Sequence, residues 1–227
     1  MNLKGLIAVL MGAGLLAAPL QTWLTLGGDM GEYLRYDTLS GQVPYVLSKL
    51  CALYAIELVW LQAMLGLLRV RLTRGGWVRP GVWRRIHTTL GTGALLAVLA
   101  HVTLFVIATS MRNRTLAVDL LLPWGHGVYR TWVAVGAASL WLILIAAAVQ
   151  LGRLFDARSR LRLHRLVFAA AVLIVVHSLA IGSESRSGLM ALTYGFMATT
   201  LCAALMGRLI GTGNAERSAP QGMASRF

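Results

Sequence analysis

The sequence predicts an all-α integral membrane protein, a bundle of six helices that cross a bilayer. Of its 227 residues, 57% are hydrophobic and only 13% are charged, whereas a soluble domain carries roughly 25% charged residues. The hydrophobic residues occur in blocks of about 20 residues, the length that spans the hydrocarbon core of a bilayer. Composition and block length together favour a membrane protein over a soluble one.

Hydropathy places the six spans near residues 4–26, 45–68, 84–110, 131–152, 164–182 and 187–209. Residues 1–210 are therefore expected to form one transmembrane domain, and residues 211–227 a disordered cytoplasmic tail, because Gly, Asn, Ser, Pro and Gln recur there. The first span follows Lys4 and passes through Ala17-Ala18-Pro19, a pattern shared with signal peptides. The length of its apolar run favours a retained helix over a cleaved signal.

The charges between the spans predict the orientation of the chain. Connectors 69–85 and 151–165 are rich in arginine, whereas connector 27–43 holds Asp29, Glu32 and Asp37 against Arg35, and connector 111–130 is mixed. The positive-inside rule then places both termini and the arginine-rich connectors in the cytoplasm of a bacterial inner-membrane protein. Because topology accounts for the net charge of +13, no nucleic-acid partner is expected.

Four of the five histidines form two pairs on the third and fifth spans. His87 and His101 lie 14 positions apart, and His164 and His177 lie 13 apart. At 1.5 Å per residue the members of each pair are separated by about 20 Å. Because the two spans run in the same direction, His87 is level with His164, and His101 with His177. Polar residues inside a span are costly and usually functional, and two level imidazole pairs suit the axial ligation of two haem irons.

The angular positions of the histidines support this interpretation only in part. On an ideal helix, His87 and His101 lie about 40° apart, but His164 and His177 lie about 140° apart. The second pair therefore requires a local bend, an over- or underwound turn, or haems that are approached from different sides. The competing interpretation is that all four side chains form hydrogen bonds between helices and bind no cofactor. A zinc site is disfavoured, because four ligands spread over about 20 Å cannot meet around one ion.

Two segments carry a family resemblance: Arg84-Arg85-Ile86-His87 leading to His101, and Arg162-Leu163-His164-Arg165 leading to His177. They resemble the ferric reductase-like transmembrane domain, a family that includes ferric reductases, NADPH oxidases and the haem subunit of the periplasmic methionine-sulfoxide reductase system. The resemblance covers roughly residues 36–182. It implies two haem b groups, an inner one held by His87 and His164 (the inner pair) and an outer one held by His101 and His177 (the outer pair).

The sequence contains no Gly-rich fingerprint of a nucleotide-binding domain. In this it is similar to the stand-alone members of the family rather than to those with a fused flavin and nicotinamide domain. The resemblance then implies electron transfer from a cytoplasmic flavoprotein or quinol to a periplasmic redox partner protein. A flavin or a quinone is an additional candidate cofactor on the cytoplasmic side.

Arginines beside the histidines are candidates to bind the haem propionates, since guanidinium groups pair well with carboxylates. Arg84, Arg85 and Arg165 lie next to the inner pair, and Arg112 and Arg186 lie near the outer end. The competing interpretation is that these side chains meet lipid headgroups and only determine topology.

Two further polar residues allow two interpretations each. Glu57, midway along the second span, belongs either to a proton or quinone site or to a polar contact with a neighbouring helix. His126, between Gly125 and Gly127, is either an exposed loop residue or a group near the electron exit.

Three functions are compatible with these features. The first is the electron-transfer subunit of an oxidoreductase system, serving a separate periplasmic reductase such as a molybdenum enzyme. The second is a self-sufficient reductase of ferric chelates or oxygen at the outer haem. The third is a non-redox membrane transporter or assembly factor. The short outer connectors leave little chain for a substrate pocket and favour the first function.

Overall fold

Long apolar blocks that lack strand-like alternation fold into helices in this protein. The computed structural model describes residues 3–26, 40–151, 156–186 and 188–217, and no strand occurs within these ranges. Within the described residues, most of each predicted span lies in a helix, so the all-α prediction is confirmed. The elements are α1 (Leu3–Leu26), α3 (Gln42–Arg74), α4 (Pro80–Asn113), η1 (Val118–Leu121), α5 (Val128–Leu151), α6 (Ala157–His164), α7 (Leu166–Ile181), η2 (Glu184–Arg186) and α8 (Gly188–Arg217).

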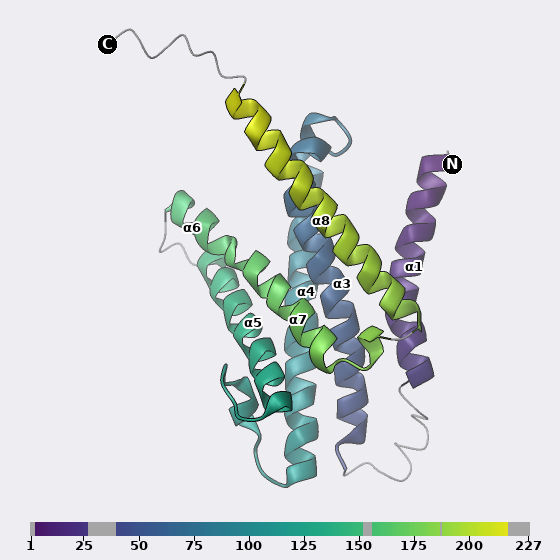
Figure 1. The fold of residues 1–227 in the computed structure, drawn as a ribbon, viewed down its shortest axis with the longest axis vertical. Helices are drawn as coiled ribbons and strands as arrows, with labels where there is room; N and C mark the ends of the chain where they lie inside the picture. Colours follow the sequence, from purple (N-terminus) through teal and green to yellow (C-terminus); the bar gives the residue numbers. More distant parts are fainter. Residues whose placement is uncertain (1–2, 27–39, 152–155, 187, 218–227) are drawn as a thin grey trace.

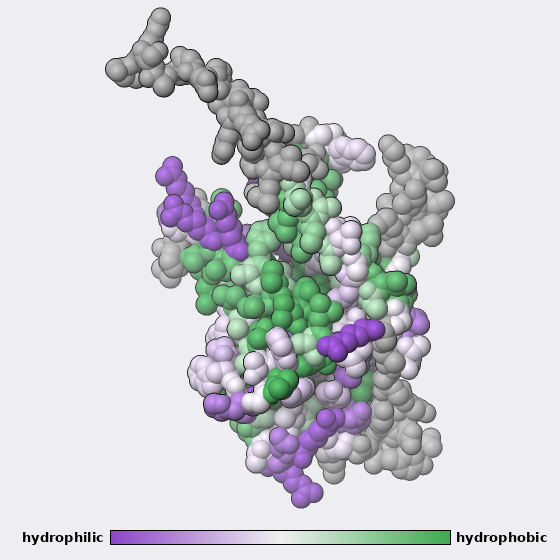
Figure 2. All heavy atoms as spheres, in the orientation of Figure 1, coloured by the Kyte–Doolittle hydropathy of each residue, from purple (hydrophilic) through white to green (hydrophobic). Residues whose placement is uncertain are grey.

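Helix length and composition support a multi-pass membrane protein. Among the described residues, five stretches are long and apolar enough to cross a membrane, namely Gln42–Val70, Pro80–Asn113, Val128–Gln150, Arg158–Ile181 and Gly188–Gly207. Helix α1 is not among the five, so the count of six spans and the cytoplasmic location of the termini stay predictions. On the face seen in Figure 2, hydrophobic residues form a central band, and hydrophilic residues lie above it on α6 and below it.

The helices run up and down along one bundle, with tilted α7 and α8 packed across the upright pair α3 and α4 (Figure 1). Helix α1 begins and α8 ends at the end of the bundle where α3 connects to α4, called here the α3–α4 end. The connection from α4 to α5 lies at the opposite end, the α4–α5 end. The arginine-rich segment 69–85 and both outermost helix ends therefore lie on the same side of the bundle.

Helix α3 is the centre of the packing. It contacts α4, α7, α8 and α1, while α5 packs mainly against α7. On one side of α3, Ile56 is buried in a cluster with Ala18 of α1 and Met190 of α8. On another side, Val59 packs with Ala94 of α4 and Ala171 of α7. Small residues at these contacts let the helix backbones approach closely, which is how helices associate inside a bilayer.

The fifth predicted span is interrupted at Arg165, between α6 and α7. There the Arg165 N–H donates to the Arg162 carbonyl at 3.1 Å, and the Phe168 N–H donates to the Arg165 carbonyl at 3.0 Å. Hydrogen bonds three residues apart belong to the tighter 3₁₀ geometry, which turns about 120° per residue instead of 100°. Three overwound residues reduce the expected separation of His164 and His177 from about 140° to about 80°. Of the alternatives left open for the 13-residue spacing, an overwound turn is the one present in the structure.

Helix α8 continues past the predicted start of the tail at Gly211 and ends at Arg217. Ala215 and Glu216 are good helix formers and extend the last turns. The rest of the predicted tail, 218–227, lies outside the described residues. So does segment 27–39, which holds the acidic residues that were used to predict the orientation.

Candidate cofactor site

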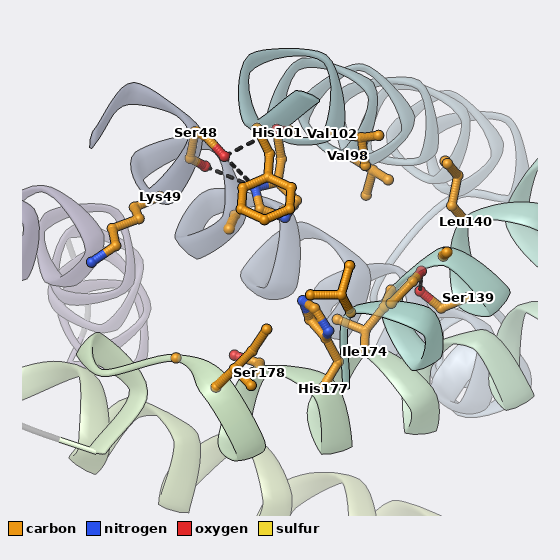
Figure 3. A pocket seen from close by; sticks show the side chains of 18 of the residues that line it. Ser48, Lys49, Val98, His101, Val102, Ser139, Leu140, Ile174, His177 and Ser178 are labelled. Carbon is orange, nitrogen blue, oxygen red and sulfur yellow. Dashed lines mark hydrogen bonds between the residues drawn. The ribbon is translucent and has the colours of Figure 1, made fainter. Parts of the chain in front are cut away.

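The outer pair lines a cavity between four helices. His101 of α4 and His177 of α7 border a space of about 160 Å³, which is also bordered by residues of α3 and α5. Figure 3 shows the two imidazoles reaching into this space from α4 on one side and α7 on the other. Apolar side chains, among them Val98, Leu140 and Ile174, form much of the wall between them. The structure thus brings together the two residues that the sequence pairs at this level.

Both outer imidazoles are held through Nδ1 by main-chain carbonyl groups of neighbouring helices. His101 Nδ1 lies 3.0 Å from the Ser48 carbonyl oxygen and 2.9 Å from the Ser48 hydroxyl, and His177 Nδ1 lies 2.7 Å from the Trp132 carbonyl oxygen. A carbonyl oxygen only accepts, so Nδ1 carries the proton in each ring. In the neutral imidazole Nε2 then keeps its lone pair, which is the arrangement of a metal-binding histidine with a supporting hydrogen bond.

Small residues make these two carbonyl groups accessible. Side chains on a helix cover the turn that precedes them, so the residue four positions later shields a carbonyl group. Four positions after Trp132 is Gly136, and four positions after Ser48 is Ala52. A Cβ atom at Gly136 would lie only 2.7 Å from both Nδ1 and Cε1 of His177. The missing side chain at Gly136 is therefore the reason that His177 reaches α5.

The inner pair lies close together at the α3–α4 end. The ring centres of His87 and His164 are 6.1 Å apart, with 76° between the ring planes. With metal–nitrogen bonds of about 2.0–2.1 Å, two imidazoles on opposite sides of one metal ion would have ring centres roughly 6.3 Å apart. The observed separation is close to that value, although the rings meet edge to face rather than along one axis.

Polar atoms without hydrogen-bond partners surround the inner pair. Nδ1 of His87 and of His164 and Oε1 of Gln62 are buried without a partner in the described part of the chain. Gln62 Nε2 lies 3.2 Å from His87 Nε2, and Trp83 stacks on the His87 ring with 4.8 Å between ring centres. Buried polar groups without a hydrogen-bond partner are energetically costly, so they call for an explanation such as a bound group. The inner site therefore differs from the outer site, where each Nδ1 is bonded.

The arginines predicted to bind propionates lie outside the cavity lining. Arg84, Arg85 and Arg165 are exposed at the α3–α4 end. The exposed Arg112 donates to the Gln42 side chain at 2.6 Å and lies over the Tyr45 ring.

Arg186 is also occupied by another contact. Its guanidinium group donates to the main-chain carbonyls of Leu179 and Ala180 at the end of α7. Cations at helix C-termini satisfy the last carbonyl groups. Arg186 is thus placed to cap α7.

Glu57 and His126 occupy opposite environments. Glu57 is 3% exposed on α3, and its Oε1 has no hydrogen-bond partner among the described residues. His126 is exposed in the loop before α5. Neither residue lines the outer cavity.

Sequence reasoning missed an ion pair in the cavity wall. Lys49 Nζ of α3 lies 2.5 Å from Glu184 Oε1 of η2, and the two side chains are 26% and 8% exposed. Both residues line the cavity. A lysine inside an apolar span is as unusual as the histidines, and this signal would have identified Lys49.

The ion pair predicts how stability depends on pH. Burial alone would raise the pKa of Glu184, but the hydrogen bond and charge of Lys49 outweigh burial and hold that pKa below its ordinary value of 4.5. A depressed pKa stabilises the fold above the ordinary value, and this contribution is lost as pH falls through the folded-state pKa. We expect Glu184→Gln to lower the unfolding free energy by about 2 kcal/mol at pH 7, somewhat below a fully buried pair.

Thermal unfolding in detergent at pH 7 and near pH 3.5 would measure this difference between wild type and Glu184→Gln. The difference should shrink at the lower pH, and an equal difference at both would contradict the prediction. Asp119→Asn is the matched control, because Asp119 pairs with Arg130 at 2.7 Å but is 65% exposed. Exposed pairs contribute about 0–1 kcal/mol.

Comparisons of the chain with known protein families, with curated proteins and with solved structures found no match. Within the described residues, no group of three or more His, Cys, Asp or Glu side chains is placed to hold a metal ion. The candidate ligands are thus the two imidazole pairs, and the likeness to the ferric reductase-like domain stays a resemblance.

Proposed function

We propose that the chain binds two haem b groups and transfers electrons across a bacterial inner membrane. The donor would be a cytoplasmic flavoprotein or quinol, and the acceptor a periplasmic redox partner protein. The observation that supports this proposal is the meeting of four histidines in two pairs, at two levels of one bundle. The inner pair has ring centres 6.1 Å apart, and the outer pair shares one cavity.

The residues at both levels suit a porphyrin with two axial imidazoles. At the outer level, Nδ1 of each ring is occupied by a carbonyl group, so Nε2 is the nitrogen left for a metal. At the inner level, buried nitrogen and oxygen atoms have no partner among the described residues, which supports a binding site for a further group. When bound, each haem would supply a one-electron redox centre without an open coordination position.

The chain itself would orient the ligands and exclude water. The Ser48 and Trp132 carbonyl groups fix the tautomer and the ring orientation of the outer pair. Apolar walls that include Val98 and Leu140 keep the local dielectric low, and burial is one of the factors that set a haem potential. An array of hydrogen-bonding histidines in a transporter would not require Nε2 to be left unprotonated in both outer rings.

Haem quantitation tests the proposal directly. The full chain would be purified in mild detergent, and reduced-minus-oxidised spectra would be recorded for wild type and for two double variants. We expect two b-type haems per chain in wild type. His101→Ala with His177→Ala should leave about one, as should His87→Ala with His164→Ala, because axial ligation depends on these side chains.

The control is His126→Ala, which removes an exposed histidine that belongs to neither pair and should leave both haems in place. No Soret absorbance in wild type would refute the proposal and favour a non-redox membrane protein. Reduction of ferric chelates or oxygen by the purified chain alone would shift the function to a self-sufficient reductase.

A further inference from the structure

The wall of the outer cavity carries one pair of opposite charges. Among the described residues that line it, Lys49 is the one basic side chain apart from the two histidines, and Glu184 is the one acidic side chain. Lys49 follows directly after Ser48, whose carbonyl group holds His101. Figure 3 shows the Lys49 side chain extending from α3 away from the two imidazoles, and we call this part of the wall, with Lys49, Glu184 and Tyr45, the rim.

A second cation, Arg112, lies near Lys49 on the ring of Tyr45. The ring of Tyr45 has Lys49 Nζ 4.9 Å from its centre and Arg112 Cζ 4.6 Å from its centre. Tyr45 and Tyr129 also line the cavity. Lys49 and Arg112 therefore both lie against Tyr45, but only Lys49 lines the cavity, where it pairs with Glu184 and the rest of the wall is largely apolar. An anionic group of a bound ligand would be most stable there.

The ion pair has a cost if it serves the fold alone. Replacing a buried ion pair by apolar side chains of similar volume is often neutral or stabilising. A charged pair in the wall of an apolar cavity therefore suggests a ligand with a charged group that one member of the pair can bind. The ligand class that fits is a planar apolar molecule with carboxylate groups at its edge, since the edge would reach the rim while the centre lies between the imidazoles.

We propose that Lys49 binds a propionate carboxylate of the outer haem, and that Glu184 is the counter-ion that positions the Lys49 ammonium group. This inference rests on the proposed function. It assigns to Lys49 the role that the sequence suggested for arginines, because Arg186 caps α7, Arg112 donates to Gln42, and neither arginine lines the cavity.

The test compares a ligand that has carboxylates with one that lacks them. The full chain carrying His87→Ala and His164→Ala, which leaves only the outer site, is titrated with haemin and with haemin dimethyl ester. We expect the chain to bind haemin about tenfold more tightly, the effect of one hydrogen bond to a charged group. Lys49→Met should abolish this preference, and Lys49→Arg should retain it.

Two further variants test whether Lys49 binds a haem carboxylate or only neutralises Glu184. Lys49→Met with Glu184→Gln leaves no unpaired charge in the wall, and we expect the preference for haemin to stay lost. Its recovery would show that Lys49 only neutralises Glu184, and would overturn the inference. Arg130→Met is the matched control, because Arg130 forms the other described ion pair but does not line the cavity; it should leave the preference unchanged.

Redox titration of the chain with all four histidines provides a second measurement, which does not depend on the His87→Ala and His164→Ala variant used for the haemin titration. Loss of a nearby positive charge favours the oxidised haem, so Lys49→Met should move one of two midpoint potentials to a lower value, and Lys49→Arg should not. Equal binding of haemin and its dimethyl ester by wild type would overturn this inference while haem binding stands. A wild type that binds neither compound would overturn the proposed function as well.

Discussion

Replacing Gly136 with alanine is expected to remove one of the two proposed haems from the chain. The added Cβ atom would lie 2.7 Å from Nδ1 and Cε1 of His177, a distance at which the imidazole must move. That movement would break the hydrogen bond between His177 Nδ1 and the Trp132 carbonyl. Loss of such a supporting bond typically lowers metal affinity about 10–100-fold.

The same substitution should stabilise helix α5, because alanine is favoured over glycine in a helix interior by about 1 kcal/mol. Haem loss therefore could not be explained by unfolding, provided that circular dichroism shows unchanged helicity. Gly195→Ala in α8 is the matched control, since no atom lies within 4 Å of its added Cβ. Wild-type haem content in Gly136→Ala would show that His177 is not held as described.

Gly41→Ala is expected to cost about 3 kcal/mol of unfolding free energy. Gly41 precedes α3 in a left-handed conformation with φ of 78°, which costs an L-residue about 1–2 kcal/mol. Its added Cβ would also collide with the Ala108 carbonyl oxygen and lie 3.1 Å from Met111 Cβ. Because main-chain atoms of α4 cannot move aside alone, overpacking adds about 1–3 kcal/mol.

Unfolding of the purified chain in detergent, followed by circular dichroism, would measure this cost. Gly76→Ala is the control, since Gly76 has φ of 71° but no atom within 4 Å of the added Cβ. It should cost only the conformational part, about 1–2 kcal/mol. Equal losses in the two variants would show that the start of α3 does not pack closely on α4.

The fold could be predicted from sequence because membrane helices follow from local composition. Apolar blocks of bilayer length located the long helices α1, α3, α4, α5, α7 and α8, but not the short polar helix α6, which lies in a connector predicted between spans. The break at Arg165 was anticipated only as a requirement of the His164–His177 spacing, because the overwound turn depends on hydrogen bonds that hydropathy does not encode. The extent of α8 beyond Gly211 was underestimated, because glycine and asparagine near a helix end weaken helical preference without ending the helix.

The pairing of the histidines could be predicted, but the groups around them could not. The level of each pair follows from helical rise, and the common face of His87 and His101 from periodicity, whereas the partners of His101 and His177 depend on how α3 and α5 pack against α4 and α7. Gln62 approaches His87 because Gly91 has no side chain, a contact between helices that a single sequence does not reveal. Only arginines were considered as partners of a carboxylate, so Lys49 was not among the candidates.

The hydrogen bonds from the outer pair to the Ser48 and Trp132 carbonyl groups also determine where the site can tolerate substitution. Every amino acid at position 132 presents the same carbonyl oxygen, so a change of Trp132 need not disturb the bond to His177. The position that must stay small is instead Gly136, where an added Cβ would lie 2.7 Å from the His177 ring. Ala52 has the corresponding position, four residues after Ser48. A search for relatives of this site should therefore look for a missing side chain one turn beyond the acceptor, rather than for a particular residue at the acceptor itself.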